Sequence, residues 1–415
     1  MSFPCIPVAS PLHDAASLEA ATGAFHRALQ SIGGAPAPDP VPAAADTPFW
    51  FVLTGGVEGE VLRRIDAWRA AGGRGPVLVV AHPGHNSLPA SLEILARVRQ
   101  LGGQGRLHLL RAPDDAGTLS AIARTAKALD ANRRLAGERI GQIGAPSDWL
   151  VASSHDAATV RRRFGAELVP VTLDEVRTLM RQEQATPPTP SELAPWRGAT
   201  SRDGVSESAY AQAVALHRAL KAVVAKYALS AITVRCFDWV RQDGTTGCLA
   251  LALLADSGIS AGCEGDIPSI LALRWLWHLT GRPAWMANPA ALDPATGDLR
   301  LAHCTIPLGL VGSYAFKTHF ESGLGLGIDG TLPRGPVTLL RLGGADLGEC
   351  WCAEGELLAD THDDGQCRTQ ALVRIPSDAL DLLLSRPLGN HLVLAPGHHR
   401  ALLTEAFSLL DARAP

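Results

Sequence analysis

Short apolar runs alternate with longer amphipathic segments in the first third of the chain. The apolar runs lie at 48–56, 76–82 and 107–112, and segments with helical spacing of apolar residues lie at 15–32, 57–71, 87–101 and 117–135. Continuous apolar strands between helices are typical of a parallel, doubly wound sheet, which is buried on both faces. We expect a first α/β domain over 1–136. The Pro-rich stretch at 35–42 cannot be helical and is predicted to be a connector.

The same alternation continues over 137–262 and predicts a second α/β domain. Strands are expected at 139–144, 149–154, 167–171 and 231–236, and helices at 157–164 and 207–227. A further apolar helix should begin at Gly247-Cys248. Residues 183–205 are rich in Pro, Ser and Thr, and we expect a long surface loop there, with a lid as one alternative.

From 263 onwards the pattern changes to short strands separated by turn residues. Apolar strands are expected near 283–287, 299–304, 336–343, 349–358, 367–375 and 391–396, followed by an amphipathic helix at 400–410. This spacing predicts a mixed or antiparallel, barrel-like β domain over 263–415. The fold class is therefore α/β, with two parallel-sheet domains followed by a β-rich domain.

Two acidic residues interrupt the apolar pattern where the second and third predicted domains meet. Glu264 and Asp266 lie in the stretch CEGDIPS, between an apolar run and an apolar helical segment at 270–279. Buried carboxylates are costly unless they are paired, hydrogen-bonded or bound to a metal. A metal site is one interpretation. In the other, Asp266 caps the following helix and Glu264 forms a salt bridge.

The composition of the chain argues against several classes of function. The 415 residues carry a formal net charge of −4 with dispersed Lys and Arg, which does not indicate a nucleic-acid surface. No apolar run approaches the ~20 residues of a membrane span, and the N-terminus does not resemble a secretory signal. Eight cysteines without CxxC spacing indicate reduced thiols and a cytoplasmic location. Dinucleotide and P-loop motifs are absent, so no nucleotide cofactor is expected.

Several stretches occur in the order found in a known family of sugar enzymes. They are TGGVEG (54–59), AHPGHNSLPASLE (81–93), IGQIGAPSDWLVAS (140–153), VRCFDW (234–239), GISAGCEGDIPSILALRW (258–275), LAHCTIPLG (301–309), GPVTLLRLG (335–343) and GNHLVLAPGHHRALL (389–403). With these motifs the chain resembles the L-fucose isomerase and L-arabinose isomerase superfamily, in particular its shorter fucose-isomerase-like members.

The resemblance implies a fold, a reaction and an assembly. It implies two N-terminal α/β domains, the first of them flavodoxin-like, and a C-terminal domain of antiparallel strands. It implies aldose–ketose isomerisation of a sugar through an enediol, with a divalent metal that is usually Mn²⁺, Mg²⁺ being an alternative. It also implies trimers or hexamers of this chain, with sites near subunit interfaces.

The metal ligands of fucose isomerases are a Glu, an Asp and a His. Asp266 and His391 match the Asp and the His. The position of the Glu falls near Gly247-Cys248, and no carboxylate occurs between Asp243 and Asp256. Because of this departure, a metal-dependent lyase or aldolase and an inactive sugar-binding paralogue remain alternatives to the isomerase.

The candidate site residues follow from these motifs. We expect the metal to be held by Asp266, His391 and Glu264. The expected catalytic residues are Glu264, Asp266 and Cys248, and the expected substrate-binding residues are His303, His319, Asn390 and His398.

Overall fold

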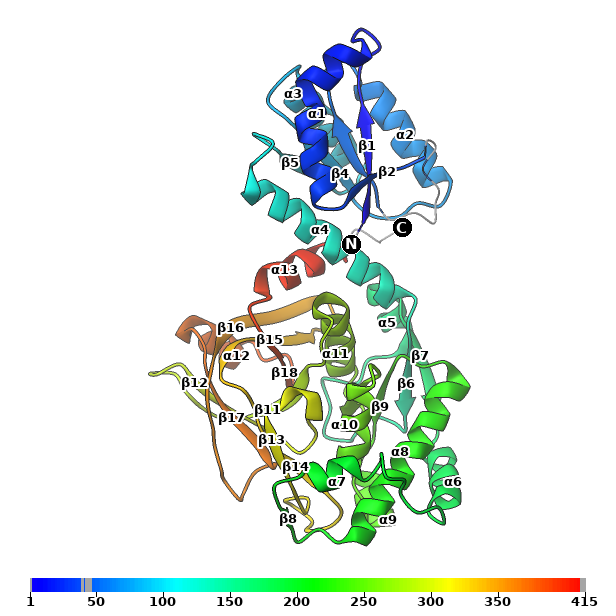
Figure 1. Cartoon of the computed structure of the whole chain (residues 1–415), viewed down its shortest axis with the longest axis vertical. Helices are drawn as coiled ribbons and strands as arrows, with labels where there is room; N and C mark the ends of the chain where they lie inside the picture. Colours follow the sequence, from blue (N-terminus) through cyan, green and yellow to red (C-terminus); the bar gives the residue numbers. More distant parts are fainter. Residues whose placement is uncertain (1, 39–40, 42–46, 411–415) are drawn as a thin grey trace. The chain divides into compact units, whose positions relative to one another are not determined.

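The computed structural model describes residues 2–38, 41 and 47–410, which form two compact units. The first unit comprises Met1–Arg133 and Leu402–Pro415, and the second comprises Arg134–Ala401. Two parallel sheets and a closed antiparallel barrel confirm the predicted fold class (Figure 1). The predicted division into domains over 1–136, 137–262 and 263–415 stays a prediction.

The first unit contains a parallel sheet with the strand order β2-β1-β3-β4-β5. Its strands are β1 (Phe3–Val8), β2 (Gly34–Pro36), β3 (Phe49–Val52), β4 (Val77–Ala81) and β5 (Gly105–Leu109). The helices are α1 (Ala15–Ser31), α2 (Glu58–Ala70), α3 (Ser87–Gln100) and α4 (Ala116–Ala136), together with most of α13 (Arg400–Ser408). All four helices predicted in this part of the chain are present, to within about a residue at each end.

Two apolar layers enclose this sheet and explain why its strands are continuously apolar. Trp50 and Val52 of β3 pack in one layer with residues of α2 and α3, such as Trp68. Phe49 and Phe51 point to the other layer, which includes residues of α1 and α4. Alternate residues of one strand thus face opposite helical layers, as a doubly wound sheet requires.

The predicted connector at 35–42 lies partly within the described residues. Gly34–Pro36 forms the edge strand β2, which is parallel to β1. Proline lacks the N–H that donates to a neighbouring strand. It is tolerated in an edge strand because one side of that strand has no neighbour. Residues 39–40 and 42 lie outside the described part of the chain.

The second unit contains a four-stranded parallel sheet with the order β10-β9-β6-β7. Its strands are β6 (Arg139–Ile143), β7 (Glu167–Val171), β9 (Ala231–Val234) and β10 (Ser260–Cys263). The helices along this part of the chain are α5 (Ala157–Phe164), α6 (Leu173–Glu183), α8 (Glu207–Tyr227), α9 (Phe237–Asp243), α10 (Cys248–Asp256) and α11 (Ile267–Thr280).

The closed barrel has the strand order β11-β12-β17-β16-β15-β18 and antiparallel neighbours throughout. Its strands are β11 (Trp285–Asp293), β12 (Asp298–His303), β15 (Gly335–Gly343), β16 (Glu349–Asp360), β17 (Thr369–Arg374) and β18 (Leu392–Pro396), accompanied by η1 (Leu308–Leu310) and α12 (Ser377–Ser385). The barrel strands supply residues to a continuous apolar core, among them Leu301, Leu339, Val373 and Leu394.

The predicted surface loop at 183–205 contains two short regular elements. They are α7 (Ala194–Gly198) and β8 (Arg202–Asp203), and β8 joins β13 (Ser313–Lys317) and β14 (Gly327–Thr331) in a small sheet. Trp196 stacks on Phe316 at 6.2 Å between ring centroids, which fixes this segment to β13. The Pro-rich composition indicated a loop and gave no sign of this packing.

The strand predicted at 149–154 is wrong. These residues form successive turns, in which the Leu150 N–H donates to Ser147 O and the Ser153 N–H donates to Leu150 O. The apolar letters in WLVASS suggested burial, but Trp149 and Val151 are exposed. Both neighbouring places beside β6 are occupied by β7 and β9, so no position next to β6 is open to a further strand.

In the described part of the chain, no helix combines the length and the apolar character that a membrane crossing requires.

A buried ion pair connects α11 with the start of β6. Glu138 accepts hydrogen bonds from Arg274 Nε (2.8 Å) and Nη2 (2.7 Å), and from His278 Nε2 (2.9 Å). The Arg274 and Glu138 side chains are about nine-tenths buried. This contact fixes α11, whose N-terminus carries Asp266.

We expect Arg274→Leu to lower the free energy of unfolding by about 2–3 kcal/mol, because it leaves the buried Glu138 carboxylate short of partners. Urea-induced unfolding would measure the change. Arg374→Leu is the control, since Arg374 pairs with Asp298 but its side chain is 53% exposed. That variant should lose less than about 1 kcal/mol. Equal losses in both variants would contradict a structural role for Glu138–Arg274.

Candidate metal centre

The candidate site is built on a tight turn between β10 and α11. The strand ends at Cys263 and the helix begins at Ile267. Between them, Glu264 (φ +68°) and Gly265 (φ +80°) both have left-handed backbone conformations. A Cβ at Gly265 would lie 2.6 Å from Pro146 Cα, so this position requires glycine. The positive φ of Glu264 is unfavourable for a residue with a long side chain, which is typical of functional turns.

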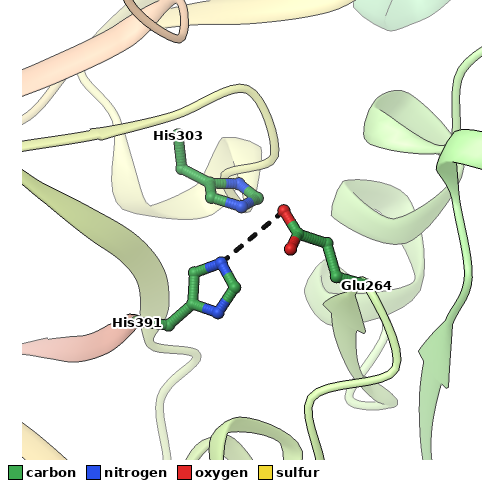
Figure 2. A group of neighbouring side chains, drawn as sticks. All are labelled: Glu264, His303 and His391. Carbon is green, nitrogen blue, oxygen red and sulfur yellow. Dashed lines mark ion pairs between the residues drawn. The ribbon is translucent and has the colours of Figure 1, made fainter. Parts of the chain in front are cut away.

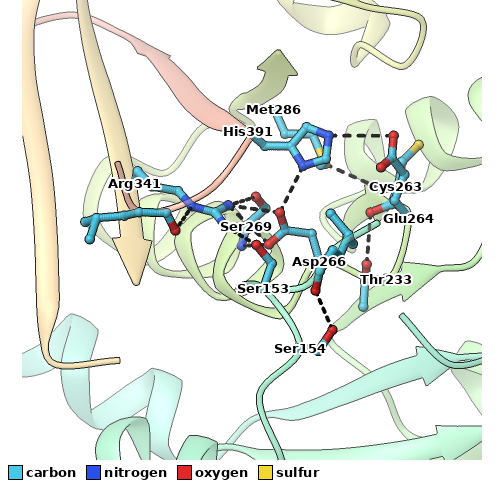
Figure 3. Close-up of polar contacts among 12 residues, drawn as sticks. Ser153, Ser154, Thr233, Cys263, Glu264, Asp266, Ser269, Met286, Arg341 and His391 are labelled. Carbon is cyan, nitrogen blue, oxygen red and sulfur yellow. Dashed lines mark hydrogen bonds and ion pairs between the residues drawn. The ribbon is translucent and has the colours of Figure 1, made fainter. Parts of the chain in front are cut away.

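Asp266 is completely buried and makes three kinds of contact (Figure 3). Its Oδ1 accepts from the Ser269 N–H at 2.8 Å, which makes it the N-cap of α11. Its two oxygens also accept from Arg341 Nη1 at 3.2 and 2.9 Å, and Oδ2 lies 2.9 Å from His391 Nδ1. Burial alone would raise the pKa of Asp266, but the Arg341 and His391 charges hold it well below its usual range.

Arg341 is the buried cation of this site and was not predicted from the sequence. It projects from β15 with 1% of its side chain exposed and also donates to Ser269 Oγ, Ser153 Oγ and Leu388 O. A Cβ at Gly389 would overlap its guanidinium, so the glycine before Asn390-His391 makes room for Arg341. The available signal was a single Arg within the otherwise apolar strand TLLRLG.

Glu264, His303 and His391 form a second group beside this ion pair (Figure 2). All three are buried, and one ligand atom from each lies within 4.8 Å of the others. Glu264 Oε1 is 3.6 Å from His391 Nε2, and the two imidazole centroids are 5.6 Å apart. One carboxylate and two imidazoles converging in this way could hold a metal ion.

The ring nitrogens of His391 have different environments. Nδ1 is hydrogen-bonded to Asp266, whereas Nε2 is buried without a hydrogen-bond partner among the described residues and faces Glu264. A hydrogen bond from one imidazole nitrogen to a carboxylate is the usual way to direct the other nitrogen to a metal. In His303, Nδ1 accepts a 3.2 Å hydrogen bond from the Thr305 N–H.

The two imidazoles have opposite pKa shifts. Burial disfavours the charged form of His391, but its contacts with Asp266 and Glu264 outweigh burial and raise its pKa to about 9. Burial, together with repulsion from His391, lowers the pKa of His303 to about 4. For Glu264, burial is outweighed mainly by His391, and its pKa is lowered. These pKa shifts correspond to a protonated His391 between two carboxylates.

Of the three predicted metal ligands, the structure brings two into this group. Glu264 and His391 contribute to it together with His303, which we had expected to contact substrate. Asp266 lies on the other side of the His391 ring, against Arg341. The sequence also suggested that Asp266 caps the following helix. In the structure Asp266 both caps α11 and pairs with Arg341.

The other predicted site residues lie outside the Glu264–His303–His391 group. Asn390 and His398 are exposed at the two ends of β18. His319 is buried in the loop between β13 and β14, where its Nδ1 lies 3.2 Å from Ser322 Oγ. Cys248 is buried at the start of α10, where its contact with Cys304 and its burial raise its pKa well above the usual range of a thiol. All eight cysteines are free thiols.

Trp149 completes the surroundings of Glu264 and was also missed. Its indole N–H donates to Glu264 Oε2 at 2.6 Å, and half of its surface is exposed. It lies in the family-like stretch at 140–153 and was misassigned to the start of a strand at 149–154.

No family model matches the chain. Over 226 residues it is 26% identical to a sulfoquinovose isomerase from Clostridium sp. (strain MSTE9). This alignment covers 53% of this chain and 49% of that protein. Over 268 residues it is 24% identical to a sulfoquinovose isomerase from Alkalicoccus urumqiensis, covering 58% of each. The chain thus spans about half the length of the curated relatives it matches, and both of these relatives are named for the isomerisation of one sugar.

Proposed function

We propose that the protein is a sugar isomerase that interconverts an aldose and a ketose and uses a divalent metal held by Glu264, His303 and His391. The observation that carries the metal site is the buried Nε2 of His391, which lies 3.6 Å from Glu264 Oε1 and has no hydrogen-bond partner within the described ranges. The reaction type is suggested by the names of the two relatives. Sulfoquinovose is therefore the first sugar to test, and an L-fucose-like sugar is the second.

The donor set fits a divalent first-row metal. One carboxylate oxygen and two imidazoles suit Mn²⁺ better than Mg²⁺, which prefers oxygen ligands alone. When bound, the metal would supply Lewis-acid polarisation of a carbonyl or hydroxyl oxygen of the sugar. We keep Mn²⁺ as the proposed ion, since the resemblance to fucose isomerases implies it, and Co²⁺ and Zn²⁺ as comparisons.

Asp266 takes the role of a positioning residue in this proposal. Its carboxylate oxygens already accept from Arg341, Ser269 and His391. Asp266 accepts the hydrogen bond from His391 Nδ1–H, so the lone pair on Nε2 is directed to the proposed metal position. Its charge is balanced by Arg341, which keeps the carboxylate ionised although it is buried.

Isomerisation moves a proton between two adjacent carbon atoms, and Glu264 is the group we assign to it. Its Oε2 is held by the Trp149 N–H, while Oε1 lies 3.6 Å from His391 Nε2. A positioned carboxylate of this kind can accept and return a proton. Cys248 is less suited, because its raised pKa keeps the thiol protonated. The predicted trimer or hexamer and the cytoplasmic location stay predictions.

The first prediction concerns the reaction. Wild-type protein loaded with Mn²⁺ should catalyse incorporation of solvent deuterium at the second carbon of sulfoquinovose, followed by mass spectrometry or NMR. Glu264→Gln should lower this rate at least about 10²-fold, because Glu264 is both the proposed general base and one of the proposed metal ligands. Glu356→Gln, an exposed carboxylate on β16, is the matched control. Cleavage products without deuterium exchange would favour the lyase or aldolase alternative instead.

The second prediction concerns the pH dependence of metal binding. A metal at His391 Nε2 must displace a proton at any pH below about 9, because the pKa of His391 is raised to that value. His303, with a pKa of about 4, is already neutral. The apparent Mn²⁺ association constant should therefore rise about tenfold per pH unit from pH 7 to 8.5.

Isothermal titration calorimetry in two buffers with different ionisation enthalpies measures both the affinity and the number of protons released. One proton per Mn²⁺ near pH 7.5 is expected, and an affinity independent of pH would contradict metal binding at His391. Mn²⁺ binding itself should be lost in His391→Gln.

The third prediction concerns Asp266. Asp266→Asn leaves Arg341 as a buried, unpaired charge and should lower the free energy of unfolding by about 3–5 kcal/mol. It should also weaken Mn²⁺ binding at least about tenfold, since His391 loses its orienting partner. Ser153→Ala removes one hydrogen bond from the same guanidinium and should cost only about 1 kcal/mol. Unchanged Mn²⁺ affinity in a folded Asp266→Asn protein would remove Asp266 from the site.

A further inference from the structure

Trp149 combines exposure with an unusually fixed position. Half of the side chain is accessible, yet its indole N–H is held by the buried Glu264 carboxylate at 2.6 Å. Large aromatic side chains that are both exposed and fixed are typical of binding surfaces, because little side-chain entropy is lost when a ligand packs on them.

The loop that carries Trp149 is fastened to the site turn at several points. The Ser147 N–H donates to Glu264 O at 2.8 Å, and the Ile267 N–H donates to Ser153 O at 3.3 Å. Arg235 Nη1 donates to Pro146 O at 2.6 Å, and the same guanidinium pairs with Asp148. The turns at 147–153 therefore position Trp149 relative to Glu264 before any ligand binds.

The indole is the outer member of an aromatic row. Phe237 packs edge-on against Trp149 with 5.1 Å between ring centroids, and His319 packs edge-on against Phe237 at 5.5 Å. Phe237 and Glu264 contact the indole, and half of the Trp149 surface remains exposed. Such a surface suits the apolar C–H face of a sugar, whose hydroxyl groups can then point to Glu264 and the imidazoles.

We propose that Trp149 is the platform on which the sugar packs, and that its N–H positions Glu264 for the reaction. This inference rests on the proposed isomerase function and adds a sugar-binding residue to it. The two roles belong to different parts of one side chain: the ring surface binds substrate, and the N–H holds Oε2 of Glu264.

Two substitutions separate these roles. Trp149→Phe keeps an aromatic surface and removes the N–H, whereas Trp149→Gln keeps a donor and removes the ring. Val151→Gln, at a fully exposed position of the same loop, controls for damage to the loop. Each protein is compared for sulfoquinovose affinity by calorimetry, for KM and kcat of deuterium exchange, and for Mn²⁺ affinity.

Trp149→Gln should raise the sulfoquinovose Kd and KM about 5- to 10-fold, the value of one aromatic contact, and should weaken Mn²⁺ binding less than Trp149→Phe does. Trp149→Phe should keep KM within about threefold and weaken Mn²⁺ binding about tenfold, as expected when a ligand loses its hydrogen-bond donor. Val151→Gln should match wild type in all three measurements.

Three outcomes would overturn this inference. If wild type binds the sugar and Trp149→Gln binds it equally well, Trp149 is not the sugar platform, whereas the isomerase proposal still stands. Equal losses in Val151→Gln and Trp149→Gln assign the effect to the loop rather than to the indole. If wild-type protein binds neither sulfoquinovose nor L-fucose, both this inference and the proposed function fail.

Discussion

The contact between Asp266, Arg341 and His391 determines the arrangement of the whole candidate site. It joins three segments that are distant in the sequence: the start of α11, the strand β15 and the residue before β18. All three side chains are almost completely buried, so none of these charges has water as an alternative partner. Removing any one of them would leave a buried charge unbalanced, and the three residues therefore act as one unit.

This unit also sets the electrostatics of the Glu264–His303–His391 group. Asp266 fixes which nitrogen of His391 faces Glu264, and the combined negative charge of Asp266 and Glu264 keeps that ring protonated in the metal-free protein. A proton on His391 thus lies at the place proposed for a cation and balances the charge of the two carboxylates. His303 stays neutral close by because burial disfavours its charged form and because a second positive charge there would repel His391.

Much of the fold was predictable because its strands and helices follow strict periodicities. The alternation of apolar strands and helices up to 262 and the short strands after it indicated the two parallel sheets and the barrel. The error at 149–154 arose because apolar residues predict burial, whereas Trp149 and Val151 are exposed on turns. No local pattern distinguishes an apolar residue that packs in a core from one that faces a site.

The site was only partly predictable for a related reason. Glu264 and Asp266 stood out as polar residues beside apolar runs, and His391 followed from the family resemblance, but their partners depend on contacts across the fold. Arg341 lies on an apolar strand, and its role is evident only once β15 is placed beside the N-terminus of α11. His303 was recognised as a pocket residue, but its position next to His391 depends on how the barrel closes. Distances of this kind are not encoded in spacing along the chain.

Gly389 has a consequence for how this site can change during evolution. Its missing side chain leaves the space that the Arg341 guanidinium fills, although the two residues belong to different segments. A larger residue at 389 would expel the cation and leave Asp266 uncompensated, so position 389 can vary only after position 341 has changed. Homologues that carry a side chain at this glycine should therefore have lost the arginine as well, and must neutralise their buried aspartate by other means.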